Sequence, residues 1–311
     1  MPIFGNANFC CCFAQHIHRH QPPSMNLLRL LFISSLLFIF FLSVTTPFSA
    51  CTKTLTQIEH DTTVVTRTDT ITQIDTLIVV DSIYDLQDGL VGYYNFNGGN
   101  LNDSSGYGNN ITFNNATPTT DRFERANNAY FFDGVNDYMV IPNDGTLNPT
   151  NITIKAIVKF SGFNLGICHA SQILMKGSQD QDQGTYGIRV IQGDGSCATE
   201  LDTTTQQFSG YYGDYGYPAG CLDHNYYIRT NTWVTMVYTY DGRKSSIYIN
   251  GELSSTTNGT AQFYPNGYDV YIGKTQNPTY PYTFNGAIDE IRIYNRALSP
   301  AAVKQLSNLT N

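Results

Sequence analysis

Positive charge and tryptophan are scarce in this 311-residue chain. Lys and Arg number 17 against 25 Asp and Glu, the formal net charge is −8, and no run of Lys or Arg occurs. A nucleic-acid groove needs clustered positive charge to displace counterions, so we expect no nucleic-acid partner. Only 14% of the residues are charged and one is Trp, whereas 22 are Tyr. Together with abundant Thr, Asn and Gly, this composition favours strands and turns over helices.

The first fifty residues contain no Asp, Glu or Tyr. An apolar stretch over Leu30–Val44 follows a basic residue, and small residues then lead to Cys51. This order is typical of a secretion signal, and its end resembles the lipobox of bacterial lipoproteins, in which the Cys is lipidated. We therefore expect a signal segment over 1–50, with Met25 as an alternative start, and a protein anchored by lipid at the outer membrane, the cell surface or the periplasmic face. Ordinary cleavage after Ala50 or an uncleaved anchor are the alternatives.

The composition changes over residues 51–88, where Thr, β-branched residues and Asp dominate. Asp69, Asp75 and Asp81 recur every six residues. Thr and β-branched residues favour an extended backbone, and the segment has too little apolar bulk for a core of its own. We expect a lipidated, extended stalk that holds a domain away from a membrane. A coiled coil is the alternative, although no sustained heptad supports it.

From residue 89 to residue 311 the sequence consists of short alternating runs separated by Asn, Gly and Asp turns. This pattern is typical of an all-β sandwich or barrel, and we predict one large sandwich domain over 89–311. The predicted strands are Leu90–Phe96, Asn128–Phe132, Tyr138–Ile141, Ile152–Phe160, Gln172–Lys176, Tyr186–Ile191, Trp233–Tyr240, Ser245–Ile249, Val270–Ile272 and Ala287–Tyr294.

Turn and cap residues mark the connections. Asp241-Gly242 and Asn250-Gly251 predict hairpins, because a type I′ turn needs positive φ at both central residues. Ser299 is the predicted N-cap of one helix near the end of the chain, with a proline in its first turn.

Four motifs in order make the domain similar to a known family. They are Gly92–Phe96 with Leu101–Asn109, Tyr130–Tyr138, Asn231–Trp233 with Tyr240–Gly242 and Tyr248–Gly251, and Phe284–Leu298. These motifs resemble a laminin-G-like domain of the concanavalin A-like lectin/glucanase superfamily. The resemblance implies a two-sheet antiparallel jelly-roll sandwich. It says little about function, because one fold hosts many functions.

The resemblance also implies a structural calcium ion. Asp103 and Asn109 offer hard oxygen ligands between Gly-rich turns. Asp289 lies in an apolar strand, where a buried carboxylate needs a cation or hydrogen-bond donors. The alternative is that Asp103 caps an Asx turn and that Asp289 accepts backbone N–H bonds.

The sequence gives little support to an enzyme. Glucanases of this superfamily place two Glu around an Asp on one strand, as the acid pair of a glycosidase requires. The nearest string here is Ala287–Arg292, in which Ala and Arg stand at the outer positions. No Ser carries a nucleophile-elbow sequence either. We therefore predict a protein without catalytic residues.

Two segments look inserted relative to the family pattern, Ser161–Ser171 and Gln192–Arg229. They contain Cys168, Cys197 and Cys221, the only cysteines after residue 51. In an oxidising compartment three thiols form at most one internal disulfide. The sequence does not choose the pair, and Cys197–Cys221 would close the longer segment.

The longer segment also holds six of the Tyr within 211–227. Tyrosine rings that stack on sugars, beside acids that accept sugar hydroxyls, make a carbohydrate site, and Tyr is a general recognition residue of binding loops. The predicted ligand-binding residues are Tyr211, Tyr212, Asp214, Tyr215, Tyr217, Asp223 and His224. The alternative is that these tyrosines pack the segment onto the sandwich.

These observations predict a membrane-tethered extracytoplasmic module that recognises glycan through loops of a β-sandwich. The second hypothesis is a structural or adhesive surface protein that contacts a cell-surface protein. A polysaccharide hydrolase is the third, and turnover of a polysaccharide would reveal it.

Overall fold

The structure, a computed structural model, describes the part of the chain that follows residue 82. The described ranges are 83–166, 169–177, 185–192, 200–213, 219–261 and 263–309. The predicted signal segment, Cys51 and most of the predicted stalk lie outside them. No helix in these ranges has the length and apolar character needed to cross a membrane.

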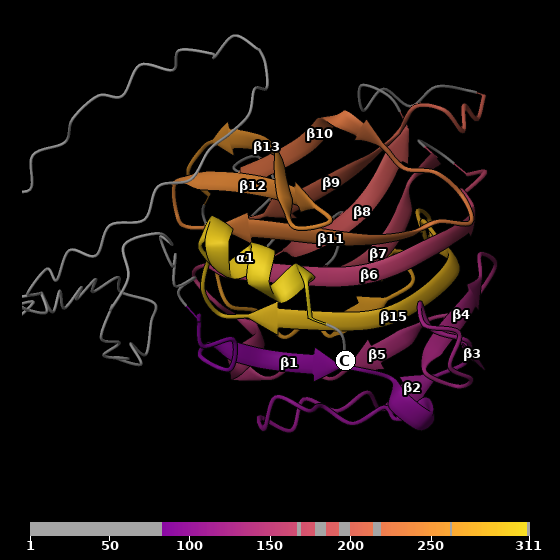
Figure 1. The fold of residues 1–311 in the computed structure, drawn as a ribbon, viewed down its shortest axis with the longest axis horizontal. Coiled ribbons are helices and arrows are strands. Elements are labelled where there is room, and N and C mark those ends of the chain that lie inside the picture. Colours follow the sequence, from indigo (N-terminus) through magenta and orange to yellow (C-terminus); the bar gives the residue numbers. More distant parts are fainter. Residues whose placement is uncertain are drawn as a thin grey trace, which may run out of the picture. The chain divides into compact units, whose positions relative to one another are not determined.

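In the described part of the chain fifteen strands form two sheets, and every pairing between named strands is antiparallel (Figure 1). The eight-stranded sheet runs in the order β13 (Glu252–Asn258), β12 (Lys244–Ile249), β11 (Trp233–Tyr240), β6 (Ile152–Gly162), β15 (Asn285–Tyr294), β4 (Ala129–Asp133) and β3 (Thr117–Thr119), and β1 (Leu90–Tyr94) also pairs with β15. The seven-stranded sheet runs in the order β10 (Ala219–Tyr227), β9 (Gln206–Tyr212), β8 (Tyr186–Gln192), β7 (Ser171–Lys176), β14 (Val270–Ile272), β5 (Met139–Ile141) and β2 (Phe113–Asn114). The predicted two-sheet jelly-roll sandwich is confirmed.

The turn and cap predictions are confirmed with one exception. Asn250 and Gly251 have φ of 51° and 85°, as the type I′ turn between β12 and β13 requires. The side chain of Ser299 accepts a bond from the Ala302 amide at the start of α1 (Pro300–Ser307). At Asp241-Gly242 only the glycine has positive φ, and the Asp241 carboxylate accepts bonds from the Arg243 and Lys244 amides, so this turn is not type I′.

The core lies between the sheets and is rich in tyrosine. Tyr94, Tyr186, Tyr212, Tyr238 and Tyr240 are fully buried there. Each has a partner for its hydroxyl or ring; for example, Tyr94 Oη donates to the Asn109 carbonyl at 2.6 Å. The tyrosine excess of the sequence therefore serves packing along the strands, where alternate residues face the core.

The segment Gln192–Arg229, which looks inserted relative to the family pattern, contains strands that were not predicted. It contributes two strands of the seven-stranded sheet, β9 and β10. β13 and the short β2 and β3 were not predicted either. The segment that looked additional therefore builds one end of the seven-stranded sheet.

The domain begins before the predicted boundary at residue 89. The Tyr84 backbone amide donates to Oε1 of Gln305 in α1 at 2.8 Å, and Nε2 of the same side chain donates to the Tyr84 carbonyl at 2.9 Å. Arg296 donates to the Asp85 and Asp88 carbonyls, and Leu86 is buried against α1 and β15. The last residues assigned to the stalk are therefore fixed to the sandwich.

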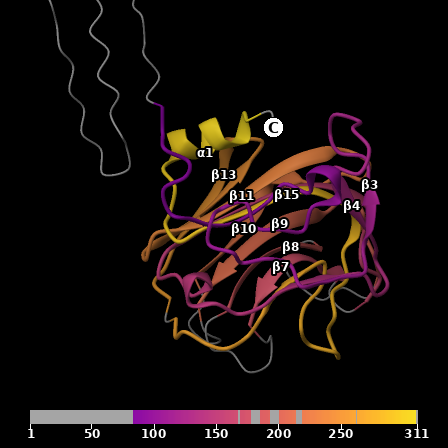
Figure 2. The same cartoon turned by 90° about the horizontal axis from the view of Figure 1, so that it is seen from below.

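The two outer faces of the sandwich are covered differently. α1 packs on the outer face of the eight-stranded sheet, and Figure 2 shows it on the side opposite β7 and β8. The outer face of the seven-stranded sheet carries a small buried apolar cluster of Ala170, Ile191 and Tyr282, with Leu222 and Tyr280 packed against it. Within the described ranges no helix covers this second face.

Candidate functional site

A continuous row of side chains crosses the outer face of the seven-stranded sheet. Its members are cross-strand partners in register, one from each strand. In the order β2 to β10 the row is Phe113, Val140, Tyr271, Met175, Gly187, Tyr211 and Gly220. The strand neighbours of these residues face the core, so the pleat turns the row outward. Tyr211 thus lies between Gly187 and Gly220, which have no side chains to rise above the sheet on either side of it.

The Tyr211 ring packs directly on the backbone of Gly187, where a side chain would block it. A Cβ at Gly187 would stand 2.6 Å from Tyr211 Oη and 2.8 Å from its Cζ, so the phenol lies over the glycine. The Arg189 guanidinium stands 5.2 Å from the centre of the ring, within the range of a cation–π contact. Burial raises the pKa of Tyr211 to about 12, so the hydroxyl is a neutral donor and acceptor at physiological pH.

A hollow of about 500 Å³ opens beside this ring. Its lining comes from β8, β9 and β10 and from β13 of the other sheet: Arg189, Ser209, Gly210, Tyr211, Gly220, Cys221, Leu222, His224, Ser255, Thr256 and Thr257. An aromatic ring beside a guanidinium, an imidazole and several hydroxyls is the mixture of apolar surface and polar groups that small-molecule sites use. The hollow is therefore our candidate site.

Aromatic rings continue along the same face toward β2. Phe113 stacks on Tyr138 with ring centres 4.6 Å apart, and Tyr138 lies 5.8 Å from Tyr271 in a parallel orientation. Lys274 Nζ sits 3.8 Å from the centre of the Tyr138 ring. The face thus carries two groups of aromatic residues, one around Tyr211 and one around Tyr138, each with a cation on a ring.

The structure brings two of the predicted ligand-binding residues together. Tyr211 and His224 both line the hollow. Asp214, Tyr215 and Tyr217 lie outside the described residues.

The remaining two predicted residues are buried. Tyr212 is 1% exposed, stacks on Tyr240 and Phe263, and donates from Oη to the Pro149 carbonyl at 2.6 Å. The packing alternative therefore describes Tyr212. Asp223 is fully buried and accepts bonds from the Ser254 hydroxyl and a backbone amide, so it joins β10 to β13.

The predicted disulfide receives no support. Cys221 is a free, buried thiol whose Sγ lies 3.5 Å from the Thr257 hydroxyl. Burial raises the pKa of this thiol, which keeps it protonated. Cys168 and Cys197 lie outside the described residues.

The predicted calcium ligands do not form one site. Asp103 accepts bonds from the Tyr93, Ser105 and Asn109 amides and from the Ser105 hydroxyl, at 2.7–3.0 Å. These four donors fill the acceptor positions of a carboxylate, and the bond from Ser105 is that of an Asx turn. The Asn109 amide group donates to a backbone carbonyl and to a hydroxyl.

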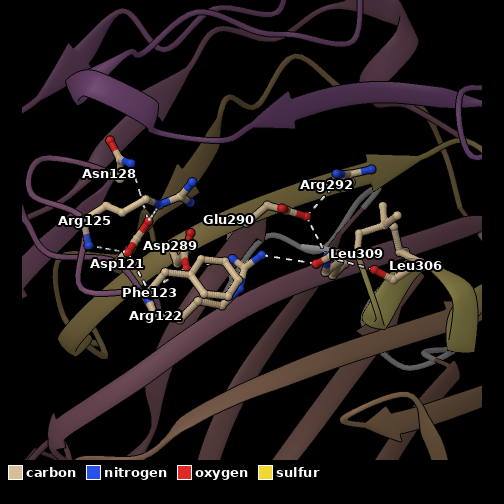
Figure 3. A network of polar contacts seen from close by, with 11 residues as sticks. Asp121, Arg122, Phe123, Arg125, Asn128, Asp289, Glu290, Arg292, Leu306 and Leu309 are labelled. Atoms are coloured by element: carbon tan, nitrogen blue, oxygen red, sulfur yellow. Dashed lines mark hydrogen bonds and ion pairs between the residues drawn. The ribbon is translucent and has the colours of Figure 1, made fainter. Parts of the chain in front are cut away.

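Asp289 has a guanidinium where a metal ion was predicted. Its Oδ2 accepts from Arg122 Nη1 at 2.7 Å and from the Arg122 amide at 3.2 Å (Figure 3). Burial raises the pKa of Asp289, although Arg122 opposes the effect. Among the described residues no group of three or more His, Cys, Asp or Glu side chains could hold a metal ion. The residues predicted for calcium therefore do not fit the ion as they are arranged.

The only acids of the glucanase-like string are closed to a substrate. A β-bulge between Ile288 and Glu290 turns both Asp289 and Glu290 to the outer face of β15. Glu290 Oε1 accepts from Arg292 Nε at 2.8 Å (Figure 3). It also accepts from Lys155 Nζ at 2.7 Å. The side chains of Asp289 and Glu290 are at most 5% exposed, so no polysaccharide reaches this acid pair.

Sequence reasoning missed several residues of the site, Gly187, Arg189, Tyr138, Tyr271 and Lys274. A glycine inside a predicted strand was an available signal, because it often marks close approach of another group. The other four could not be joined to Tyr211 without the register of seven strands.

A second hollow, of about 570 Å³, lies among loops that include the predicted insertion Ser161–Ser171. Phe163, Asn164 and Leu165 line it on one side and Asp133 and Val135 on the other. Val135 and Leu165 are 74% and 79% exposed. Exposed apolar side chains beside a hollow are suited to protein contact.

A family model described as the concanavalin A-like lectin/glucanases superfamily matches residues 133–304, which is more than half of the chain. No curated protein matches the sequence.

Several solved structures share the fold at low sequence identity. Domain 4 of AbnA, an extracellular arabinanase from Geobacillus stearothermophilus in complex with arabinotriose, has a TM-score of 0.50 and 19% identity, over 70% of this chain and 98% of that one. The binding domain of Paraclostridial Mosquitocidal Protein 1 has a TM-score of 0.55 and 16% identity, over 72% and 53%. The binding domain of botulinum neurotoxin DC in complex with SialylT has a TM-score of 0.52 and 13% identity, over 72% and 52%. This chain spans about half the length of the two toxin domains, and at these identities the likeness concerns the fold alone.

Proposed function

The chain belongs to the concanavalin A-like lectin/glucanases superfamily, and from this premise we propose that it is a non-catalytic module that binds glycan on the outer face of its seven-stranded sheet. The observation that carries the proposal is the Tyr211 ring, which lies over Gly187 at the edge of a hollow with Arg189 and His224. A ring held against the sheet offers apolar area with little loss of side-chain entropy on binding.

The polar lining supplies what the hydroxyls of a sugar need. Arg189 donates, the Ser209 and Thr257 hydroxyls donate or accept, and His224 does either according to its tautomer. A buried acid pair without access, Asp289 and Glu290, agrees with a binding role rather than hydrolysis. Two relatives in fold were solved with arabinotriose and with SialylT, which supports a glycan as the ligand class.

A glycan array tests this function, followed by titration of the best ligand into the full chain. Tyr211→Ala should weaken binding by about 2 kcal/mol, roughly 30-fold in Kd, because it removes the central ring. The matched control is Tyr227→Ala, which removes an exposed tyrosine of the neighbouring strand outside the hollow. An array with no binding would contradict the proposal, and so would equal losses in the two variants.

A protein partner is the second candidate function, and the exposed pair Val135 and Leu165 favours it. One toxin binding domain of this fold was solved with rat synaptotagmin II, which shows a protein partner for the architecture. A blank glycan array with retained assembly on the cell surface, lost in Leu165→Asp, would support this function instead.

Export and lipidation at Cys51 complete the proposal. The lipobox-like end of the signal segment supports them, and the contacts of Tyr84 and Leu86 give a tether a fixed point on the domain. Mass spectrometry of the exported protein should find a lipidated N-terminal Cys51. Residues before Cys51 on that protein would contradict lipidation.

A further inference from the structure

Two cations stand on the outer face of the seven-stranded sheet without a carboxylate. Arg189 lies over the Tyr211 ring at 5.2 Å, and Lys274 lies over the Tyr138 ring at 3.8 Å. Both are half-buried, and neither forms an ion pair with any residue in the described ranges. They therefore present charge toward the face on which we place the glycan.

Many cations elsewhere in the molecule pair with acids, although Lys159, which lies over the Trp233 ring at 5.0 Å, and Lys244 form no ion pair with a described residue. Those with a carboxylate within 3.4 Å are Arg122, Arg125, Lys155, Arg292, Arg296 and Lys304. The chain has eight more acids than bases, so an unpaired cation does not reflect a shortage of carboxylates. Arg189 and Lys274 are instead held by tyrosines, which leaves their charge for a ligand.

Arg189 also has an unused donor. Its Nε is buried and has no hydrogen-bond partner among the described residues, and the same holds for Oε1 of Gln172, its cross-strand partner on β7. A buried donor without a partner costs free energy, more so when it is charged. An acceptor supplied by a ligand would remove that cost, and a carboxylate or sulfate matches the planar fork of a guanidinium.

The two cations belong to one stretch of the sheet. Arg189 is on β8, and β7 is next to it. Lys274 lies two residues after the end of β14, and the intervening Gly273 amide donates to the Ile173 carbonyl of β7. Two strand spacings separate their backbones, about 10 Å. A ligand of a few sugar units that crosses the strands would meet both cations and the Tyr211 ring.

We propose that the glycan is anionic, an oligosaccharide that carries carboxylate or sulfate groups. This proposal rests on the proposed function, glycan binding at the outer face of the seven-stranded sheet. Tyr211 stacks on one sugar ring, Arg189 binds an acid group beside that ring, and Lys274 binds an acid group further along the chain. Glycan is favoured over an acidic peptide because the cations stand beside rings that a sugar face can cover.

Titration calorimetry of the full chain with four probes tests this inference. The probes are an oligogalacturonate, its methyl ester, a sulfated galactan oligomer and polyglutamate. We expect the oligogalacturonate or the sulfated oligomer to bind about 10- to 100-fold more tightly than the neutral ester, the range of a charge-assisted hydrogen bond. Whichever of the two binds more tightly identifies the acid group.

Three variants locate the effect. Arg189→Gln and Lys274→Gln should each lose most of the preference for the acidic oligomer over the neutral ester. Lys244→Gln, at an exposed cation of the other sheet, is the control. If Arg189→Gln unfolds, as circular dichroism would show, Lys274→Gln and the salt dependence of binding still decide the matter.

The outcomes separate the two proposals. Equal binding of acid and ester overturns the anionic ligand and leaves the glycan function intact. No binding of any probe, together with a blank array, overturns both. Binding of polyglutamate as tight as that of the acidic oligomer overturns the anionic glycan in favour of an acidic peptide.

Discussion

Two pairs of cations, one pair on the outer face of each sheet, are held in opposite ways. On the eight-stranded sheet, Lys155 and Arg292 share Glu290, and the whole group is buried beneath α1. On the seven-stranded sheet, Arg189 and Lys274 rest on tyrosines, are half-buried, and have no carboxylate among the described residues.

On the eight-stranded sheet, cationic side chains bind carbonyls at the C-terminal end of the chain and so hold α1 on the sheet. Lys155 Nζ also donates to the Leu306 carbonyl, and Arg122 donates to the Leu309 carbonyl (Figure 3). Cations at the C-terminus of a helix satisfy carbonyls that the helix leaves unpaired. A charge that is buried and fully paired stabilises the fold, whereas an accessible charge that rests on an aromatic ring is available for binding. Under the proposed function, one sheet face serves structure and the other serves recognition.

The sharpest test of this division removes the acid of the covered face. Glu290→Gln should lower the free energy of unfolding by about 3–5 kcal/mol, because it leaves Lys155 and Arg292 buried without their counterion. Glycan affinity of the folded variant should stay unchanged. Urea denaturation measures the first and calorimetry the second.

Glu252→Gln is the control for that variant. Glu252 pairs with Lys304 at 2.8 Å, but both side chains are more than half exposed, so the change should cost less than about 1 kcal/mol. Equal losses of unfolding free energy in the two variants would show that the buried ion pairs of Glu290 contribute no more to stability than an exposed pair.

A substitution at Gly187, on which the Tyr211 ring packs, tests the outer face of the seven-stranded sheet in the same way. Gly187→Ala brings a Cβ within 2.6 Å of Tyr211 Oη and of the Leu174 carbonyl, so the ring must leave its position. We expect a loss of about 1–3 kcal/mol in stability, as for other overpacked sites, and a loss of glycan affinity at least as large as that of Tyr211→Ala.

Gly220→Ala occupies the other side of Tyr211 in the same row. A Cβ there meets only the Gly210 carbonyl, at 3.7 Å, so neither stability nor affinity should fall. Retained affinity in Gly187→Ala would remove Tyr211 from the site.

The sequence predicts the inner side of the sandwich better than its outer side. Strands such as Trp233–Tyr240 alternate strongly, and Asn250-Gly251 requires one turn type, so the core and its hairpin follow from local patterns. β9 breaks the pattern, because Gly210 stands at a core position. The ring of Tyr238 would lie 2.1 Å from a Cβ there, and only the folded structure reveals that contact.

The residues of the candidate site are likewise only partly predictable from the sequence. The density of tyrosine near residue 211 predicts a binding region, but Tyr211 and Tyr212 look equivalent until the phase of β9 is known. One faces outward to the hollow, and the other is buried in the core. Arg189 and Lys274 lie 85 residues apart, and only the order β8-β7-β14 brings them together.

A smaller effect concerns the pH dependence of the covered face. Lys155 and Arg292 hold the pKa of Glu290 below its ordinary value of 4.5 despite the opposing effect of burial. When the pH falls below 4.5, the unfolded chain takes up this proton before the folded chain does, so stability is lost until the folded pKa is reached. The slope from this group is at most about 1.4 kcal/mol per pH unit.

Glu290→Gln lacks that proton, so its unfolding free energy should depend less steeply on pH below 4.5. The difference between the two proteins cancels the other carboxyls, including Asp121 and Asp289. Urea denaturation at several pH values measures it, and parallel curves would mean that Glu290 titrates alike in the folded and unfolded chains.

The smallest expected effect is that of chelation, and here the contacts disagree with the family resemblance. Asp103 is filled by four protein donors, and Asp289 is bound to Arg122, so neither carboxylate has a place for calcium. EDTA should therefore leave the melting temperature unchanged, and added calcium should not raise it, because an ion stabilises a fold only if it binds the folded state. Arg122→Ala would free Asp289. A calcium-dependent rise in melting temperature in that variant, and not in the parent protein, would show that the guanidinium stands where related domains hold the ion. A rise in the parent itself would restore the calcium prediction.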